Sequence, residues 1–251
     1  MDWQVFRKRK AELGRPFMMA HRGASALLPE NSLAAFARAL ADGADILETD
    51  LRFSKEGEIV LMHDETVDRT TTGSGPVRDL SLAEFKRLTV RHAGGVSRVN
   101  EAPPTLQSLI DLTGAQVPLA LELKDLLFAQ PQYGQKLARC LHDCHMLDKV
   151  ILVSFDLSRL QTMKALEPAL ATGWITLSNP LPNHPVEFLG PFWPLLLLNP
   201  LYAAGARRSG KIICPLDPRP EPRLRLYLKL GLDALLTNDP ATTLAALSQK
   251  P

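Results

Sequence analysis

The sequence alternates short apolar runs with segments long enough to form helices, and this alternation limits the fold more than any other feature. Nearly continuous apolar runs are typical of parallel strands buried on both faces, and a parallel connection needs a crossover that is usually a helix. The pattern therefore predicts an α/β protein with a largely parallel sheet. The runs occupy residues 17–20, 44–51, 58–62, 117–123, 149–155, 172–178, 194–199, 211–216 and 233–238.

The third of these runs is too close to the second for a helical crossover. Only RFSKEGE separates Leu51 from Ile59, and Lys55-Glu56-Gly57 suits a turn. We expect a hairpin in which paired positions sum to about 111, so that His63 lies opposite Glu48. The remaining runs then supply the strands of a (β/α)8 TIM-type barrel with a hairpin extension after the second strand.

The length fits one domain. A chain of 251 residues can bury one large core, and a single barrel spanning residues 1–251 is expected. Helix starts are predicted at Pro29–Ser32 and at Ser81–Glu84, the second with the spacing of a capping box. The long connection 64–104 is expected to form no more than a minimal cap over the pocket.

Composition excludes several classes of partner. The net charge is +2, which gives no broad field for nucleic acid, so a small-molecule substrate is expected. The sequence has no apolar leader and no apolar run of membrane-spanning length, so a cytoplasmic protein without stable membrane insertion is expected. Three cysteines argue against a disulfide framework. The oligomeric state is not predicted.

Polar residues lie at the ends of several predicted strands, where hydrophobic patterning alone would not place them. The carboxyl ends of barrel strands and their loops form one face, so residues distant in sequence can converge there. We take these residues as one candidate site: His21, Arg22, Glu48, Asp50, His63, Glu122 and Lys124.

Three of these residues are carboxylates that suggest a metal site. Glu48 and Asp50 are two positions apart on one strand, so their side chains point the same way. Together with Glu122 they would repel one another unless a cation joined them, and an all-oxygen set favours Mg²⁺ or Ca²⁺ over zinc. The alternative is that each carboxylate pairs with a nearby arginine or lysine.

The two histidines at strand ends suggest proton chemistry. Imidazole transfers protons near neutral pH, so His21 and His63 are candidates for the base and the acid. Arg22 and Lys124, with a bound cation, would stabilise charge on phosphoryl oxygens, which phosphoester cleavage requires. The alternative for either histidine alone is a hydrogen-bonded residue of the core.

Residues 21–75 carry HRG, PEN, ExD, HD and RTT in that order, followed by LELK at 121–124, SF at 154–155 and GLDALLTNDP at 231–240. In this ordered set the chain resembles the glycerophosphodiester phosphodiesterase family. The resemblance implies a barrel hydrolase that uses Mg²⁺ or Ca²⁺ to cleave glycerophosphodiesters into glycerol 3-phosphate and an alcohol. It further implies attack by the substrate's own glycerol hydroxyl, through a cyclic phosphate that water opens.

Carried over by position, the resemblance makes His21 and His63 the acid and base, and Arg22 and Lys124 the phosphate contacts. It makes the metal ligands Glu48, Asp50 and Glu122.

Two segments depart from the family pattern. Residues 214–217 read Cys-Pro-Leu-Asp where Trp-Thr-Val-Asn is common, so the aromatic wall is either absent or supplied from elsewhere, with Phe192 and Trp193 as the candidates. Residues 237–240 read Thr-Asn-Asp-Pro where TD-x-P is usual. We expect neither departure to touch the metal or the histidines, and both to affect which alcohol or lipid group is recognised.

Three other interpretations remain open. The first is a lysophospholipase D, in which the apolar segment 191–202 contacts an acyl chain; a buried barrel strand is the alternative for that segment. The second is a non-catalytic barrel that binds phosphodiesters. The third concerns a zinc site, since thiolates and imidazoles are zinc ligands, and its candidate residues are Cys140, His142, Cys144 and His145.

Overall fold

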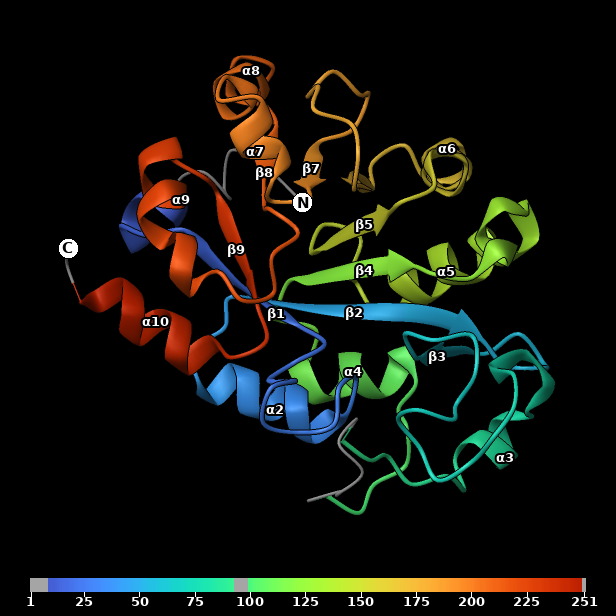
Figure 1. Ribbon diagram of the computed structural model, residues 1–251. Coiled ribbons are helices and arrows are strands. Elements are labelled where there is room, and N and C mark those ends of the chain that lie inside the picture. The colour runs from blue at the N-terminus through green and yellow to red at the C-terminus, as the bar shows by residue number, and fades with distance from the viewer. Residues whose placement is uncertain (1–8, 93–98, 250–251) are drawn as a thin grey trace.

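The computed structural model describes residues 9–92 and 99–249, and in these residues a barrel of parallel strands is surrounded by helices (Figure 1). Each strand is buried, as expected where helices cover one face and the barrel interior the other. The barrel strands are β1 (Phe17–His21), β2 (Ile46–Phe53), β4 (Leu119–Leu123), β5 (Val150–Ser154), β6 (Ala171–Thr176), β7 (Phe188–Pro191), β8 (Ile212–Ile213) and β9 (Ala234–Thr237).

The strands follow the order β8-β7-β6-β5-β4-β2-β1-β9. The short strand β8 meets β9 through Asp233, whose amide donates to the carbonyl oxygen of Ile213 at 3.1 Å. The Asp233 carboxylate also accepts from the Ile213 amide at 3.0 Å. These contacts bring the two ends of the sheet together and confirm the predicted (β/α)8 barrel.

The helices lie around the outside of the barrel (Figure 1). Ser32 caps the first of them by accepting from the Ala35 amide, and Ser81 and Glu84 form the predicted capping box. The helices are α2 (Leu33–Ala41), α3 (Leu82–Phe85), α4 (Leu106–Thr113), α5 (Pro131–Asp143), α6 (Leu157–Leu166), α7 (Leu195–Leu198), α8 (Tyr202–Arg208), α9 (Leu224–Leu230) and α10 (Pro240–Ser248), with 3₁₀ turns η1 (Val77–Asp79), η2 (Leu126–Ala129) and η3 (Glu221–Arg223).

Successive residues of a strand belong to two different hydrophobic cores. Leu47, Leu121 and Leu152 pack outward with the helices, whereas Ile46 and Ile151 belong to a second cluster that fills the barrel. Because side chains alternate between the two faces of a strand, this alternation determines which polar residues near the strand ends point into the barrel.

The predicted hairpin is confirmed, but its predicted register is wrong by one residue. Strand β3 (Ile59–Leu61) returns antiparallel to β2 with Leu51 paired with Leu61, so that paired positions sum to 112. Gly57, at φ +79°, completes the turn after Ser54 and centres it on Glu56. His63 therefore follows the last pair of the hairpin and is not paired with Glu48.

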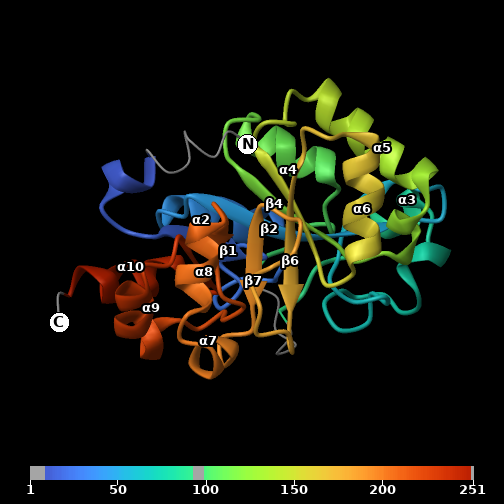
Figure 2. The same cartoon turned by 90° about the horizontal axis from the view of Figure 1, so that it is seen from above.

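The predicted strand at 194–199 is wrong. Residues 195–198 form the short helix α7 after Pro194, and the strand of this part of the barrel is β7, at 188–191. Proline favours the start of a helix, and the four leucines that follow are good helix formers. Figure 2 shows α7 at the end of the barrel toward which the β6 arrow points. The segment is therefore not the buried barrel strand considered above.

The connection after β3 forms a small cap with its own core. Val67, Val77 and Phe85 pack on Val60 and Met62 of the hairpin. Residues 93–98 of the predicted cap lie outside the described residues, as do residues 1–8, on which part of the leader prediction depends.

Candidate active site

The polar residues converge because β1, β2 and β4 are neighbours in the barrel. The register pairs His21 with Glu48, and Asp50 with Glu122. One carboxylate oxygen from each of Glu48, Asp50 and Glu122 lies within 4.8 Å of the others. The sheet thus brings together the three carboxylates that the sequence marks as a cluster.

Burial makes this cluster electrostatically strained. Burial, and then the neighbouring Asp50, raises the pKa of Glu48 well above its ordinary value and that of Glu122 to about 7. Burial opposes ionisation of Asp50 too, but Arg22 and Lys124 lower its pKa to about 2. Asp50 is thus the permanent charge of the cluster, and its neighbours hold their protons more tightly.

The cluster fits a hard divalent cation. Asp50 Oδ1 is buried and makes no hydrogen bond within the described residues. A buried carboxylate oxygen without a partner is costly, and a cation would satisfy it and relieve the repulsion among the three carboxylates. All-oxygen donor sets of this kind suit Mg²⁺ or Ca²⁺.

Two basic residues border the carboxylates. Arg22 Nε lies 3.1 Å from Asp50 Oδ2, and the Arg22 amide donates to Glu48 Oε2 at 3.0 Å. Lys124 Nζ lies 2.8 Å from Glu122 Oε1 and 3.7 Å from Asp50 Oδ1. The alternative that each carboxylate pairs with an arginine or lysine therefore holds for two of the three carboxylates, since Asp50 and Glu122 each have a basic neighbour.

His21 is half-buried and forms a hydrogen bond with a residue at the end of the last strand. Its Nδ1 lies 2.7 Å from Asn238 Oδ1. An amide oxygen only accepts, so the proton is on Nδ1 and Nε2 keeps its lone pair. Burial and then Arg22 lower the pKa of His21 to about 4, which leaves it neutral at physiological pH. The prediction that the departure at 237–240 touches neither histidine is wrong.

His63 occupies a more open position next to the cap. Its Nδ1 lies 2.6 Å from Asp64 Oδ1, and its carbonyl oxygen accepts two hydrogen bonds from Arg52. Burial lowers the pKa of His63, and Asp50 offsets part of this effect. Burial opposes ionisation of Asp64, but hydrogen bonds from Arg69 and His63 lower its pKa to about 2. His63 therefore has an ionised carboxylate partner.

Four residues that were not predicted as site residues support this arrangement. Asn31 donates to Asp50 Oδ2 at 2.9 Å and accepts from Thr49. Glu30 joins Arg22 to Arg69, with contacts of 2.9 and 2.8 Å. The PEN tripeptide was the available signal for Glu30 and Asn31, but it was interpreted as a helix start and a family motif and not as part of the site.

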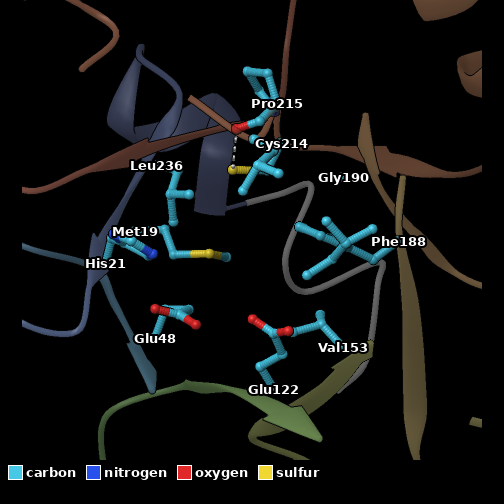
Figure 3. A pocket seen from close by; sticks show the side chains of 12 residues that line it. Met19, His21, Glu48, Glu122, Val153, Phe188, Gly190, Cys214, Pro215 and Leu236 are labelled. Carbon is cyan, nitrogen blue, oxygen red and sulfur yellow. Dashed lines mark hydrogen bonds between the residues drawn. The ribbon is translucent and has the colours of Figure 1, made fainter. Parts of the chain in front are cut away.

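The cavity beside the carboxylates has one polar side and several apolar sides. Figure 3 shows His21, Glu48 and Glu122 along one part of the wall, and Val153, Phe188 and Cys214 along the rest. The cavity has a volume of about 40 Å³, so the enclosed space itself is small. Cys214 takes part in this wall where the family pattern has an aromatic residue.

No other part of the described chain brings three acidic, histidine or cysteine side chains together as Glu48, Asp50 and Glu122 are. The cysteines and histidines of 140–145 therefore do not assemble the zinc site considered above. None of the helices in residues 9–92 and 99–249 combines the length and apolarity that crossing a bilayer requires.

Comparison with known proteins agrees with this fold. Residues 21–242 match the model of the glycerophosphoryl diester phosphodiesterase family. A glycerophosphodiester phosphodiesterase of Caldanaerobacter subterraneus subsp. tengcongensis is 32% identical over 91% of this chain and 96% of its own length.

Solved structures give the same result. An Oleispira antarctica phosphodiesterase in complex with the product sn-glycerol 3-phosphate superposes with a TM-score of 0.83 and 25% identity, covering 93% of this chain and 97% of the other. A glycerophosphodiester phosphodiesterase of Agrobacterium tumefaciens gives a TM-score of 0.80 and 26% identity, covering 93% and 99%.

The barrel and these similarities define the class of protein: it is a phosphodiesterase built on a (β/α)8 barrel. Since the family model matches most of its length, the chain belongs to the glycerophosphoryl diester phosphodiesterase family.

Proposed function

We propose that the enzyme hydrolyses glycerophosphodiesters to glycerol 3-phosphate and an alcohol, with a divalent cation and two-histidine acid/base catalysis. The observation that carries this proposal is that three buried carboxylates, His21 and two basic side chains meet at the carboxyl ends of β1, β2 and β4. His63 follows the hairpin strand β3 and is close enough to Asp50 for their charges to interact. Together with a bound cation, these are the groups that phosphodiester cleavage needs.

Glu48, Asp50 and Glu122 are the residues that would hold Mg²⁺ or Ca²⁺. When bound, the ion supplies Lewis-acid stabilisation of charge on the phosphoryl oxygens. Lys124 Nζ lies 2.8 Å from Glu122 Oε1, and with an ion on that carboxylate the ammonium group would be available to contact the phosphate. Arg22 stays fixed by Glu30 and Asp50 as a second phosphate contact.

We assign His21 as the base. It is neutral, and Asn238 keeps its proton on Nδ1, so Nε2 accepts the proton of the attacking hydroxyl group. His63 is then the acid that donates a proton to the leaving oxygen; burial lowers the pKa of His63, and the hydrogen bond to Asp64 opposes this by favouring the protonated form. Arg69 holds Asp64 in place through a 2.6 Å contact.

The test is release of glycerol 3-phosphate from glycerophosphocholine and glycerophosphoethanolamine, with EDTA and after Mg²⁺ or Ca²⁺ is restored. We expect EDTA to stop the release and an ion to restore it. We expect His21→Ala and His63→Ala each to lower kcat by about a hundredfold or more. His142→Ala, which removes an exposed imidazole from α5, is the matched control.

Full release in EDTA, or in both histidine variants, would show that the site assignment is wrong. Tight binding of both diesters without any release would instead favour the non-catalytic barrel.

A further inference from the structure

The mouth of the barrel is divided into a polar half and an apolar half. The catalytic residues come from β1, β2, β4 and the hairpin, whereas Val153 of β5, Ile175 of β6, Gly190 of β7 and Cys214, which follows β8, contribute to the cavity wall. Two positions further along the chain from each of these wall residues, just beyond the strand ends, the residue is apolar. We call this set the apolar rim: Phe155, Leu177, Phe192 and Leu216.

Contacts place the rim at the cavity. Leu216 lines the cavity itself, and it pairs with Phe192 in a parallel bridge, so that the two side chains share a side. At the other end of the rim, the ring of Phe155 lies 5.5 Å from Lys124 Nζ. The rim therefore begins beside a phosphate-binding residue and continues away from it.

The rim is open to solvent although it is apolar. Leu177 is 59% exposed and Phe192 is 37% exposed, whereas Val153 below them is buried. The exposed Leu197 and Leu198 of α7 follow Phe192 at the same end of the barrel. Leaving large apolar side chains in water beside a catalytic cavity is typical of a ligand-binding surface.

Trp193, the neighbour of Phe192, is engaged by a contact outside the rim. The guanidinium group of Arg223 lies 4.4 Å from the ring of Trp193 and bonds to the buried Asp217 at 2.6 Å. Trp193 thus packs on Arg223, and its neighbour Phe192 remains at the mouth. Of the two aromatic residues expected to replace the lost wall, Phe192 has the suitable position.

We propose that the apolar rim binds a hydrocarbon chain attached to the phosphodiester, so that the enzyme prefers alkyl- or acyl-bearing diesters to purely polar ones. This inference rests on the proposed function, because it places the phosphate on the polar half. Continuity of the rim with the catalytic cavity makes the substrate's own chain the occupant. The chain can come from either side of the phosphate, since both sides can carry one.

The experiment compares kcat/KM for three soluble diesters below any micelle-forming concentration. Glycerophosphocholine has no chain, 1-hexanoyl-lysophosphatidylcholine carries one on the glycerol, and glycerophosphohexanol carries one on the alcohol. We expect at least one chain-bearing diester to be preferred by about tenfold or more, the factor that burial of two methylene groups gives. The preferred diester identifies the side that the rim binds.

Phe192→Ser should reduce this preference several-fold. Leu112→Asn, a matched loss of an exposed apolar side chain near the end of α4, should keep it. Circular dichroism melting curves verify that both variants fold.

Equal kcat/KM for all three diesters would overturn the rim proposal and leave the proposed function intact. A preference that Phe192→Ser leaves unchanged, or that arises only above the micelle-forming concentration, would also overturn it. Failure to cleave any of the three would overturn both proposals.

Discussion

At the scale of single residues, the contact between His21 and Asn238 sets the protonation of this histidine. A neutral amide orients the imidazole but adds no charge, so burial and Arg22 dominate and the pKa of His21 falls to about 4. A base with a low pKa stays unprotonated over a wide pH range. In the proposed mechanism the amide would therefore extend activity toward acid pH, at the cost of a weaker base.

Asn238→Asp should move the acid limb of the kcat/KM profile to higher pH. A carboxylate 2.7 Å from Nδ1 favours imidazolium, so the pKa of His21 rises and the neutral form is lost at a higher pH. We expect a shift of at least about one pH unit. Gln132→Glu, the same chemical change on the exposed face of α5, should leave the profile in place. An unchanged acid limb in Asn238→Asp would exclude His21 as the titrating base.

The carboxylate cluster makes a second prediction at this scale. The pKa of Glu122 is raised to about 7 in the folded protein, whereas an unfolded glutamate loses its proton near pH 4.5. Between these values the folded state binds more protons, so stability falls as pH rises. The metal-free enzyme should lose up to about 3 kcal/mol from this group between pH 5 and pH 8.

Melting in EDTA across this pH range tests the prediction. Glu122→Gln should flatten the dependence, the exposed Glu58→Gln should not, and Mg²⁺ or Ca²⁺ should raise the Tm of the wild type at pH 8. The same slope in both variants would contradict it.

At the scale of elements, the turn after β1 positions Arg22. Arg22 and Gly23 both have positive φ, of 57° and 80°. A Cβ on Gly23 would lie 2.6 Å from the backbone of Ala35, so only glycine lets the turn approach α2 this closely. The turn directs the Arg22 amide at Glu48. Because Gly23 of the same turn packs on α2, a change in that packing would also displace Arg22.

Gly23→Ala should destabilise the enzyme by about 2 kcal/mol or more and lower its activity, since both the backbone angle and the contact with α2 oppose a side chain. Gly14→Ala is the control, because Gly14 has φ +64° but open space around it, so it should cost only about 1 kcal/mol. Urea unfolding measures both. Equal losses would show that contact with α2 is unimportant.

The helices and strands also show which parts of the fold can be predicted from sequence patterns. Buried parallel strands such as β4 and β5 are continuous apolar runs, and so they were predicted. The four leucines of α7 have the same pattern, which over so short a run does not separate strand from helix. The carboxylates and histidines were predicted because they end strands, but the bond between His21 and Asn238 joins residues 217 positions apart, and no local pattern contains it.

At the scale of the whole molecule, the barrel closes through the side chain of Asp233 as well as through the short strand β8. β8 has two residues, and Asp233 joins it to β9 while also accepting from Lys10 at 2.7 Å. The carboxylate thus connects three parts of the chain at the point where the sheet closes.

Asp233→Asn should lower the free energy of unfolding by about 1–3 kcal/mol, because a nearly buried charge-assisted pair is lost. Asp42→Asn removes an exposed helical pair with Arg38 and should cost no more than about 0.5 kcal/mol. Chemical denaturation compares the two, and equal costs would show that closure does not depend on this contact.

The division of the barrel mouth also bears on how such an enzyme diverges. Apart from His21, Arg22 and Asn238, the groups assigned to catalysis lie between residues 30 and 124, whereas the apolar rim lies between 155 and 216. If the rim selects the substrate as proposed, mutations in the second stretch would alter substrate choice while the catalytic groups keep their positions. New specificities would arise by exchange of one contiguous half-barrel, and a chimera that takes residues 150–216 from a relative should acquire that relative's substrate preference.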